Sequence, residues 1–158
     1  MLLQDCSSEV TMKYNINGQN YDLVSDLIKE TKTRKEYFAF AKNVFGLDFS
    51  IWYNSGFWGD KFVPYTLFDG DKAVASVGVS LSEIEWDGHI GRFTQLSTVM
   101  TEPSYRGKGL NQWLLKLVIS KWKVKSDCIY LYATDSVVDY YPKFGFKEKI
   151  SLPLLPHA

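Results

Sequence analysis

The sequence has no excess of charge of either sign. Its 158 residues include 18 Lys and Arg residues and 18 Asp and Glu residues, so the formal net charge is zero. A surface without a field of one sign attracts neither nucleic acid nor an anionic membrane. We therefore expect no nucleic-acid partner and no membrane partner, and any site for an anion must be built from local groups.

Cysteine, histidine and long apolar runs are also scarce. Of the two cysteines, Cys128 lies in the apolar run 128–132, which favours a reduced and buried thiol over a reactive one. His, Cys, Asp and Glu residues do not cluster at metal-ligand spacing, so we expect no metal. No apolar stretch approaches the ~20 residues of a membrane helix, and no signal-peptide pattern opens the chain. We expect a cytoplasmic protein.

No internal repeat, low-complexity tract or linker divides the chain, so we expect residues 1–158 to form a single domain. The first 20 residues are polar and are expected to be loose in part. Helical spacing predicts a short helix at residues 24–28. A capping box at Thr33–Glu36 then predicts the start of a second helix, which Gly46 ends.

Turn and cap signals divide the rest of the chain. Two Asp-Gly pairs predict β-hairpins: Asp69-Gly70 lies between apolar arms, and Asp87-Gly88 leads into a strand that ends near Met100. A capping box at Ser136–Asp139 predicts another helix, which Pro142 keeps to little more than a turn.

A strand, a turn, a helix and a strand follow one another in the second half of the chain. Apolar residues have a helical period from Leu110 to Trp122, and the short apolar run 128–133 is typical of a strand buried on both faces. This order predicts a βαβ unit in which strands 92–100 and 128–133 are parallel and the crossover is right-handed.

The turn inside this unit is rich in glycine and basic residues. Gly107 and Gly109 let a ligand approach the backbone, and Arg106 and Lys108 flank them at the start of a helix whose first N–H groups have no partner in the helix. Such a junction favours a bound phosphate over a turn without a ligand. The spacing is neither that of a P-loop nor that of the dinucleotide fingerprint.

Two segments resemble motifs of the GNAT superfamily of N-acetyltransferases. Residues 104–109 resemble its acetyl-coenzyme A loop, Gln/Arg-x-x-Gly-x-Gly/Ala, although Ser104 departs from the first position. Residues 140–146, Tyr-Tyr-Pro-Lys-Phe-Gly-Phe, resemble its Tyr-x-Lys-x-Gly-Phe segment. The two occur in the family's order, with a helix and a strand between them, and the resemblance covers about residues 65–150.

The resemblance implies an α/β GNAT fold, in which helices flank a mixed, mostly antiparallel sheet of about six strands with a splayed parallel pair. Residues 65–150 would form the acetyl-coenzyme A core, and residues 21–64 the variable acceptor side. The implied activity moves an acetyl group from acetyl-coenzyme A to an amine, such as a small molecule, by direct attack in a ternary complex. The alternative is a sensor module that binds acyl-coenzyme A without turnover.

The resemblance also implies the roles of the site residues. The pyrophosphate would rest on the amides of residues 106–111, with Arg106 and Lys108 screening its charge, and the pantetheine arm would pair with the strand end at 99–101. The implied acetyl-coenzyme A site consists of Val99, Met100, Thr101, Arg106, Gly107, Lys108, Gly109, Leu110 and Asn111.

Tyr141, four residues before Gly145 as in the family pattern, is the candidate general acid for the departing thiolate. The adjacent Tyr140 is its rival, and either ring could serve packing alone. No general base stands out among Glu83, Glu85, Glu102 and His89, and water-mediated deprotonation is an equal alternative.

The aromatic segment 47–64 has two interpretations. The rings of Trp52, Tyr53, Phe57 and Trp58 either line the acceptor pocket, where Asp48 or Asp60 would attract an ammonium group, or close the core. A short last strand is expected at 147–152, and completion of the sheet by a partner subunit would give a homodimer.

Overall fold

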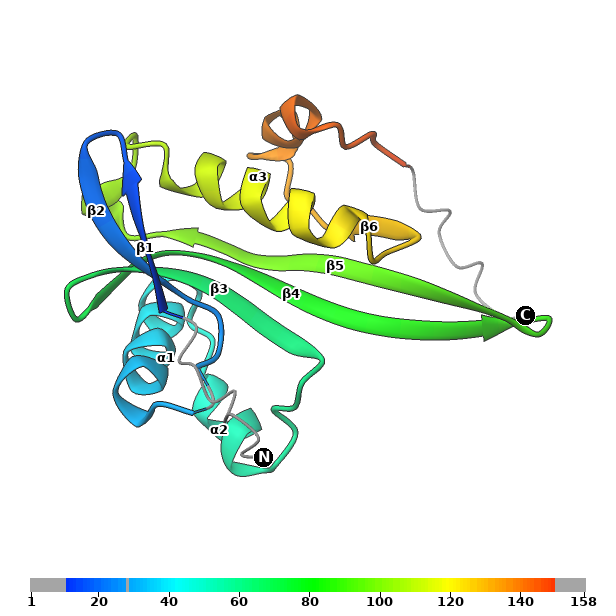
Figure 1. The fold of residues 1–158 in the computed structure, drawn as a ribbon, viewed down its shortest axis with the longest axis horizontal. Helices are drawn as coiled ribbons and strands as arrows, with labels where there is room; N and C mark the ends of the chain where they lie inside the picture. Colours follow the sequence, from blue (N-terminus) through cyan, green and yellow to red (C-terminus); the bar gives the residue numbers. More distant parts are fainter. Residues whose placement is uncertain (1–10, 28, 150–158) are drawn as a thin grey trace, which may run out of the picture.

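A computed structural model describes residues 11–27 and 29–149, and these form a six-stranded sheet in the order β1-β2-β3-β4-β5-β6 (Figure 1). Neighbouring strands are antiparallel except β5 and β6, which are parallel. The fold class predicted from the sequence is confirmed. The strands are β1 (Thr11–Ile16), β2 (Gln19–Val24), β3 (Phe62–Asp69), β4 (Lys72–Trp86), β5 (His89–Thr101) and β6 (Cys128–Leu131).

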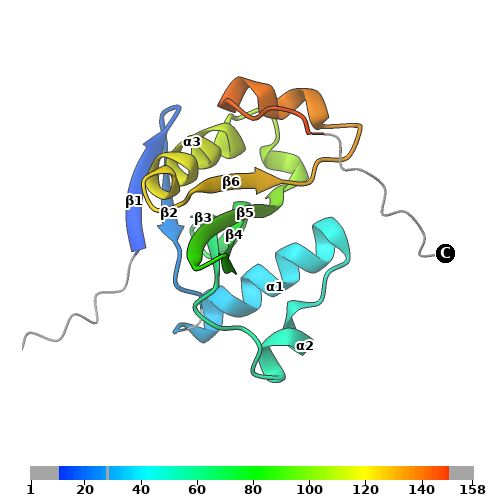
Figure 2. The same ribbon diagram turned by 90° about the vertical axis from the view of Figure 1, so that its right-hand side faces the viewer.

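Helices cover both faces of the sheet. Helices α1 (Thr31–Phe45) and α2 (Phe49–Asn54) lie on one face, and α3 (Leu110–Lys123) lies on the other (Figures 1 and 2). Two short 3₁₀ helices, η1 (Pro103–Tyr105) and η2 (Val138–Phe144), flank α3 along the chain. None of the helices in the described part of the chain is long and apolar enough to cross a membrane.

The two faces of the sheet carry separate cores because side chains alternate along each strand. Toward α3, the buried residues Val77 and Val79 of β4 pack with Leu114 and Val118 of α3. Toward α1, a second cluster is mostly aromatic and includes Tyr37, Phe40, Trp58, Phe62 and Met100. Both cores meet at β4 and β5, so these two strands are the rigid base of any site built on their ends.

Of the N-terminal segment that was expected to be loose in part, residues 1–10 lie outside the described residues, and residues 11–20 are ordered in a hairpin. Residues 11–24 form the β1–β2 hairpin, and its turn residues Asn17 and Gly18 have φ values of 52° and 88°. An Asn-Gly pair suits this left-handed turn, so the signal was present in the sequence. The short helix expected at 24–28 is wrong, because Val24 ends β2 and Leu27 lies in a turn, while Ile28 lies outside the described residues.

Helix α1 begins three residues earlier than the capping box suggested, since the box would place the N-cap at Thr33. Its N-cap is Glu30, which makes no side-chain capping bond, and the Thr33 hydroxyl donates back to the Glu30 carbonyl at 3.2 Å. The end is as predicted: Gly46 has a φ of 70° and its N–H donates to the Lys42 carbonyl. The second capping box is also wrong, because η2 has Val137 at its N-cap without a side-chain bond.

The aromatic segment 47–64 is not a wholly irregular loop, since it contains α2. Trp58 is buried, with its ring centroid 4.9 Å from that of Phe62 and 5.9 Å from that of Tyr37. This packing supports the core interpretation for Trp58. Phe57, in contrast, is 72% exposed.

The hairpins and the βαβ unit are confirmed, but strand β6 is short and lies at the edge of the sheet. It has four residues, and its Cys128 is exposed, contrary to the expected buried thiol. An edge strand has a neighbour on one side only, so an apolar run there need not be buried. Residues 147–149 of the expected last strand are not in a strand, and residues 150–152 lie outside the described part.

Candidate active site

The parallel strands β5 and β6 separate near the end of β5. Pairing joins Phe93–Leu96 of β5 to Cys128–Leu131 of β6 and then stops, whereas β5 continues to Thr101. The last five residues of β5 therefore lack a strand on the β6 side. Their backbone groups can receive an extended ligand as an added strand.

A β-bulge lies at the same point of β5. The register with β4 shifts between Ser76 and Gly78, and Thr98 has a φ of 43°, which is rare for a β-branched residue. A Cβ on residue 78 would collide with the Thr98 hydroxyl, so glycine is required there. The bulge thus turns the end of β5 away from the regular ladder at the point where β6 departs.

The glycine-rich turn joins β5 to α3. Gly107 and Gly109 both have a φ of 77°, and no atom lies within 4 Å of a Cβ built on Gly107. Gly109 is the N-cap of α3 and has no side chain to satisfy the first N–H groups of the helix. These amides and the positive end of the helix dipole suit a phosphate group.

Two distant segments hold this turn in place. The Asn17 amide nitrogen donates to the Lys108 carbonyl at 2.9 Å, and the Tyr105 hydroxyl donates to the Asp69 carboxylate at 2.7 Å. The Asp69 carboxylate, through this bond and its charge, raises the pKa of Tyr105 to about 12, with a further contribution from burial. The Lys108 ammonium lies 4.2 Å from the centroid of the Tyr105 ring.

A cavity of about 750 Å³ occupies the gap between β5, β6, η2 and the ends of α1 and α3. Every residue of the acetyl-coenzyme A site expected from the sequence lines it except Lys108, and Tyr141 lines it as well. The lining residues are Val44, Phe45, Leu96, Ser97, Thr98, Val99, Met100, Thr101, Tyr105, Arg106, Gly107, Gly109, Leu110, Asn111, Gln112, Leu131, Tyr132, Thr134, Ser136, Val137, Tyr140 and Tyr141.

Tyr141 presents a phenol to this cavity. It is 8% exposed, and its ring packs edge-on against Tyr140 at 5.5 Å and against Phe146 at 6.0 Å between centroids. Burial, together with the neighbouring Tyr140, raises the pKa of Tyr141. The phenol therefore keeps its proton at neutral pH and can donate it. Burial also raises the pKa of Tyr140, which lines the same cavity.

Two polar atoms of the cavity lining have no hydrogen-bond partner among the described residues. They are Oγ1 of Thr98, at the bulge, and Oδ1 of Asn111, in the first turn of α3. Buried polar atoms of this kind are normally satisfied by a protein group, a water or a ligand. Sequence reasoning missed Thr98, because nothing in the sequence marks a β-branched residue with a positive φ.

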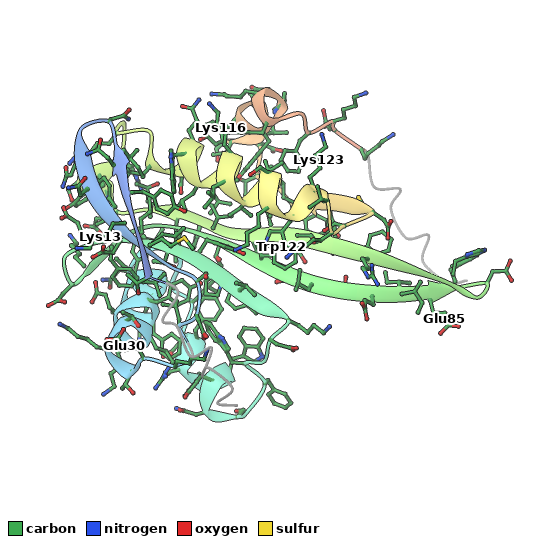
Figure 3. The ribbon with its side chains drawn as sticks, viewed as in Figure 1. Lys13, Glu30, Glu85, Lys116, Trp122 and Lys123 are labelled. Atoms are coloured by element: carbon green, nitrogen blue, oxygen red, sulfur yellow. The ribbon has the colours of Figure 1, made fainter. Side chains whose placement is uncertain are left out.

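The general-base candidates from the sequence do not line the cavity. Glu85 lies near the tip of the β4–β5 hairpin, at the opposite end of β5 from the glycine-rich turn (Figure 3). Glu83 and His89 belong to the same end of the hairpin. Glu102 forms an ion pair with Lys72 at 3.0 Å.

The aromatic segment also lies away from the cavity: Trp52, Tyr53, Phe57 and Trp58 are absent from its lining, as are Asp48 and Asp60. Asp48 accepts bonds from Ser50 and pairs with Lys42 at 3.4 Å. The interactions with Ser50, and then with Lys42, lower the pKa of Asp48. The cavity therefore does not support the interpretation of this segment as a wall of the acceptor pocket. Val44 and Phe45 at the end of α1 line the cavity instead.

The model of the GNAT acetyltransferase domain family matches residues 28–148, which include the β5–β6 gap, the glycine-rich turn and Tyr141. The chain belongs to the GNAT family. Membership places it among acetyl-coenzyme A-dependent acetyltransferases. A comparison with curated protein sequences finds no match.

Solved GNAT structures share the fold at low sequence identity. Glucosamine-6-phosphate N-acetyltransferase from Arabidopsis thaliana is 16% identical with a TM-score of 0.66, and the match covers 88% of this chain and 99% of that one. A predicted acetyltransferase from Clostridium acetobutylicum, solved with acetyl-coenzyme A, is 20% identical with a TM-score of 0.59, and 87% and 97% are covered. An aminoglycoside antibiotic 6′-N-acetyltransferase from Acinetobacter haemolyticus is 12% identical with a TM-score of 0.63, and 86% and 97% are covered.

The cavity of this GNAT protein fits acetyl-coenzyme A. One end of the cavity holds Arg106, the first amides of α3 and Gly107, where an added Cβ would meet no atom within 4 Å. The edge of β5 that β6 leaves unpaired runs from this end to the bulge. The described residues hold no group of three or more His, Cys, Asp or Glu side chains that could bind a metal ion. The end of the cavity at the glycine-rich turn thus offers backbone groups and one arginine.

Proposed function

We propose that the protein transfers the acetyl group of acetyl-coenzyme A to an amine by direct attack within a ternary complex, with Tyr141 as general acid. The observation that carries this proposal is the single cavity that joins a phosphate-binding turn, an open strand edge and a buried phenol. If the turn, the strand edge and Tyr141 had only structural roles, they would not need to line the same cavity.

The donor is held by the backbone of β5 and of the turn. The amides of residues 107–111 bind the pyrophosphate, since the expected amide of Arg106 instead donates to the Pro103 carbonyl at 3.3 Å. The Arg106 side chain, which lines the cavity, pairs with the charge of the pyrophosphate. Lys108 packs on Tyr105 outside the cavity and adds its charge at longer range. The pantetheine arm pairs with Val99–Thr101, and an amide of this edge polarises the thioester carbonyl as negative charge develops on its oxygen.

The chemical step forms a bond between the amine nitrogen and the carbonyl carbon and breaks the bond between that carbon and sulfur. Tyr141 gives its proton to the leaving thiolate, and solvent restores it. The amine gives up its proton to water, since the described residues of the lining include no carboxylate and no histidine.

We also propose a division of the chain by role within one domain. Residues 65–150 supply the turn, the strand edge and Tyr141, and residues 21–64 supply Val44 and Phe45 on the acceptor side. The acceptor is a small amine. The expected compartment remains the cytoplasm, and a homodimer remains the expected assembly, since β6 exposes an unpaired edge.

The alternative is a sensor that binds acetyl-coenzyme A without transfer. The buried phenol of Tyr141 favours the enzyme, because a pure binder needs the turn but no proton donor beside it. The two are separated by release of free thiol from acetyl-coenzyme A across a panel of amines, with the acetylated amine identified by mass. We expect thiol release that requires an amine and yields one acetylated product per thiol. Saturable binding of acetyl-coenzyme A with no thiol release for any amine would establish the sensor.

A further inference from the structure

The cavity has an uneven distribution of charge. Among its lining residues only Arg106 carries a charge, and that cation lies at the glycine-rich turn, where the start of α3 adds a positive dipole end. Among residues 11–27 and 29–149, no Asp or Glu side chain lines the cavity. This part of the chain therefore gives the acceptor half no anion with which to bind an ammonium group.

The carboxylates nearest to the acceptor half in the sequence do not change this balance. Asp48, three residues beyond α1, pairs with Lys42 and accepts bonds from Ser50. Asp135 lies between the lining residues Thr134 and Ser136, and Asp139 precedes the lining residue Tyr140, but both side chains are exposed and neither lines the cavity. A second positive charge on the acceptor would therefore find no carboxylate among the described lining residues.

The rim of the acceptor half is apolar instead. Phe45 at the end of α1 is 49% exposed, Tyr132 just after β6 is 82% exposed, and Val137 just before η2 is 43% exposed. Figure 2 shows how α1 crosses beneath the sheet so that one end reaches the side of β6 and η2. Exposed apolar side chains from three separate segments thus converge on one cavity mouth, and such convergence marks a binding surface.

We propose that the acceptor is an amine on an apolar body, an arylalkylamine or an alkylamine with a single ionisable nitrogen, whose apolar part lies against Phe45, Tyr132 and Val137. This inference rests on the proposed function, since it names the substrate class of the same site. Polyamines and aminoglycosides are poor acceptors because their further ammonium groups have no partner at this rim.

The same environment prepares the nitrogen for attack. An ammonium group that enters a partly apolar cavity without a carboxylate partner loses hydration, so its pKa falls and the neutral amine is favoured. No general base from the protein is then needed. The proton leaves to water before the nitrogen–carbon bond forms, and Tyr141 supplies the separate proton that the thiolate takes.

The acceptor class can be measured by turnover and by binding. For turnover, thiol release is compared for phenethylamine, hexylamine, spermidine, kanamycin and glucosamine 6-phosphate. We expect kcat/KM for phenethylamine to exceed that for spermidine or kanamycin by about tenfold or more, which corresponds to burial of one aromatic ring. A preference for spermidine or kanamycin would overturn the inference.

Binding gives a readout that does not depend on transfer. Calorimetric titration of phenethylamine is carried out on the protein saturated with coenzyme A, for Phe45→Ser and for the control variant Phe57→Ser. The control changes another exposed phenylalanine, one that does not line the cavity. We expect Phe45→Ser to raise the dissociation constant about tenfold and Phe57→Ser to leave it unchanged. Equal dissociation constants for phenethylamine in Phe45→Ser and Phe57→Ser would overturn the inference.

The two proposals fail in different ways. Binding of phenethylamine that depends on Phe45, without thiol release from acetyl-coenzyme A, would support the apolar amine site and contradict acetyl transfer. Thiol release that favours polycationic amines would support the transfer and contradict the apolar acceptor.

Discussion

Asn17 holds the glycine-rich turn from the opposite edge of the sheet: its side-chain amide donates to the Lys108 carbonyl at 2.9 Å. The β1–β2 hairpin that carries Asn17 therefore supports the proposed donor site although no residue of this hairpin lines the cavity. The Asn17 amide also lies 3.2 Å from where a Cβ on Gly109 would stand, so glycine allows this close approach.

Loss of this bond should weaken donor binding. We expect Asn17→Ala to raise the dissociation constant for coenzyme A about two- to tenfold, the range for one hydrogen bond of about 0.5–1.5 kcal/mol, because the turn loses a fixed position. Titration calorimetry measures this directly. Asn20→Ala is the matched control, because the Asn20 side chain bonds to Asn15 within the hairpin. Equal weakening by both variants would indicate general damage to the hairpin and contradict a specific role for Asn17.

Tyr141→Phe should remove the proton donor and keep the packing. We expect kcat to fall about 100-fold or more, with little change in coenzyme A affinity, since general acid catalysis contributes about 10²–10⁴-fold. Tyr140→Phe is the control from the same cavity, and we expect at most a few-fold loss. A large loss in Tyr140→Phe with normal turnover in Tyr141→Phe would exchange the two roles.

The pH profile of kcat tests the same assignment. Burial raises the pKa of Tyr141 above its ordinary value of about 10, so the phenol stays protonated, and able to donate, up to that pH and beyond. We expect kcat not to fall between pH 8 and about 10. A fall near pH 8 that disappears in Tyr141→Phe would contradict a raised pKa.

Gly78→Ala should disturb the bulge that shapes the end of β5. The new Cβ collides with the Thr98 hydroxyl and lies 3.0 Å from Phe62 and from Ser97, so we expect a loss of about 1–3 kcal/mol in the free energy of unfolding. The double variant with Thr98→Ala should recover part of this loss, because the colliding oxygen is gone. Gly59→Ala, where a Cβ meets no atom within 4 Å, should cost almost nothing. Denaturant titration of the four proteins checks these values, and no recovery in the double variant would contradict the collision.

Tyr37→Phe tests a buried hydroxyl beneath the bulge. The Tyr37 hydroxyl has no hydrogen-bond partner of ordinary geometry among the described residues, and burial raises its pKa, although the nearby Thr98 hydroxyl offsets part of the rise. Removal of an unpaired buried hydroxyl should leave the free energy of unfolding at pH 7 unchanged or raise it by up to about 1 kcal/mol. A loss of 1 kcal/mol or more would show that the hydroxyl is satisfied.

Tyr37→Phe should also change how the free energy of unfolding depends on pH in alkaline solution. Because the pKa of Tyr37 is raised by folding, its contribution to stability is complete below about pH 10 and is lost as the pH rises from there, when the unfolded chain ionises first. We expect Tyr37→Phe to lose less stability than the parent protein between pH 9 and 11. An identical alkaline slope in the two proteins would contradict this sign.

The sequence predicted most of the residues that meet at the glycine-rich end of the cavity, because the signals for these residues are local. The fixed positions of Gly107 and Gly109 before a helical period, and of Tyr141 before Gly145, carry this information along the chain. The Asn17-Gly18 pair is also a signal for a tight turn, but the polar residues around it favoured the prediction of a loose segment.

The proposed acceptor half depends on contacts between distant residues, so the sequence could not predict which residues line it. Phe45 reaches the cavity only because α1 crosses the sheet. Trp58, which the sequence made a candidate pocket residue, packs in the core against Tyr37 and Phe62. The positive φ of Thr98 follows from the bulge and from Gly78, not from its own preference. Cys128 is exposed because β6 is an edge strand, which depends on the sheet order.

Initial rates measured while acetyl-coenzyme A and phenethylamine are both varied test direct transfer within one complex. If both substrates occupy the cavity together, double-reciprocal plots intersect and thiol is released only when the amine is present. Parallel plots with a burst of thiol before the amine is added would contradict direct transfer, because the acetyl group would then pass through the protein.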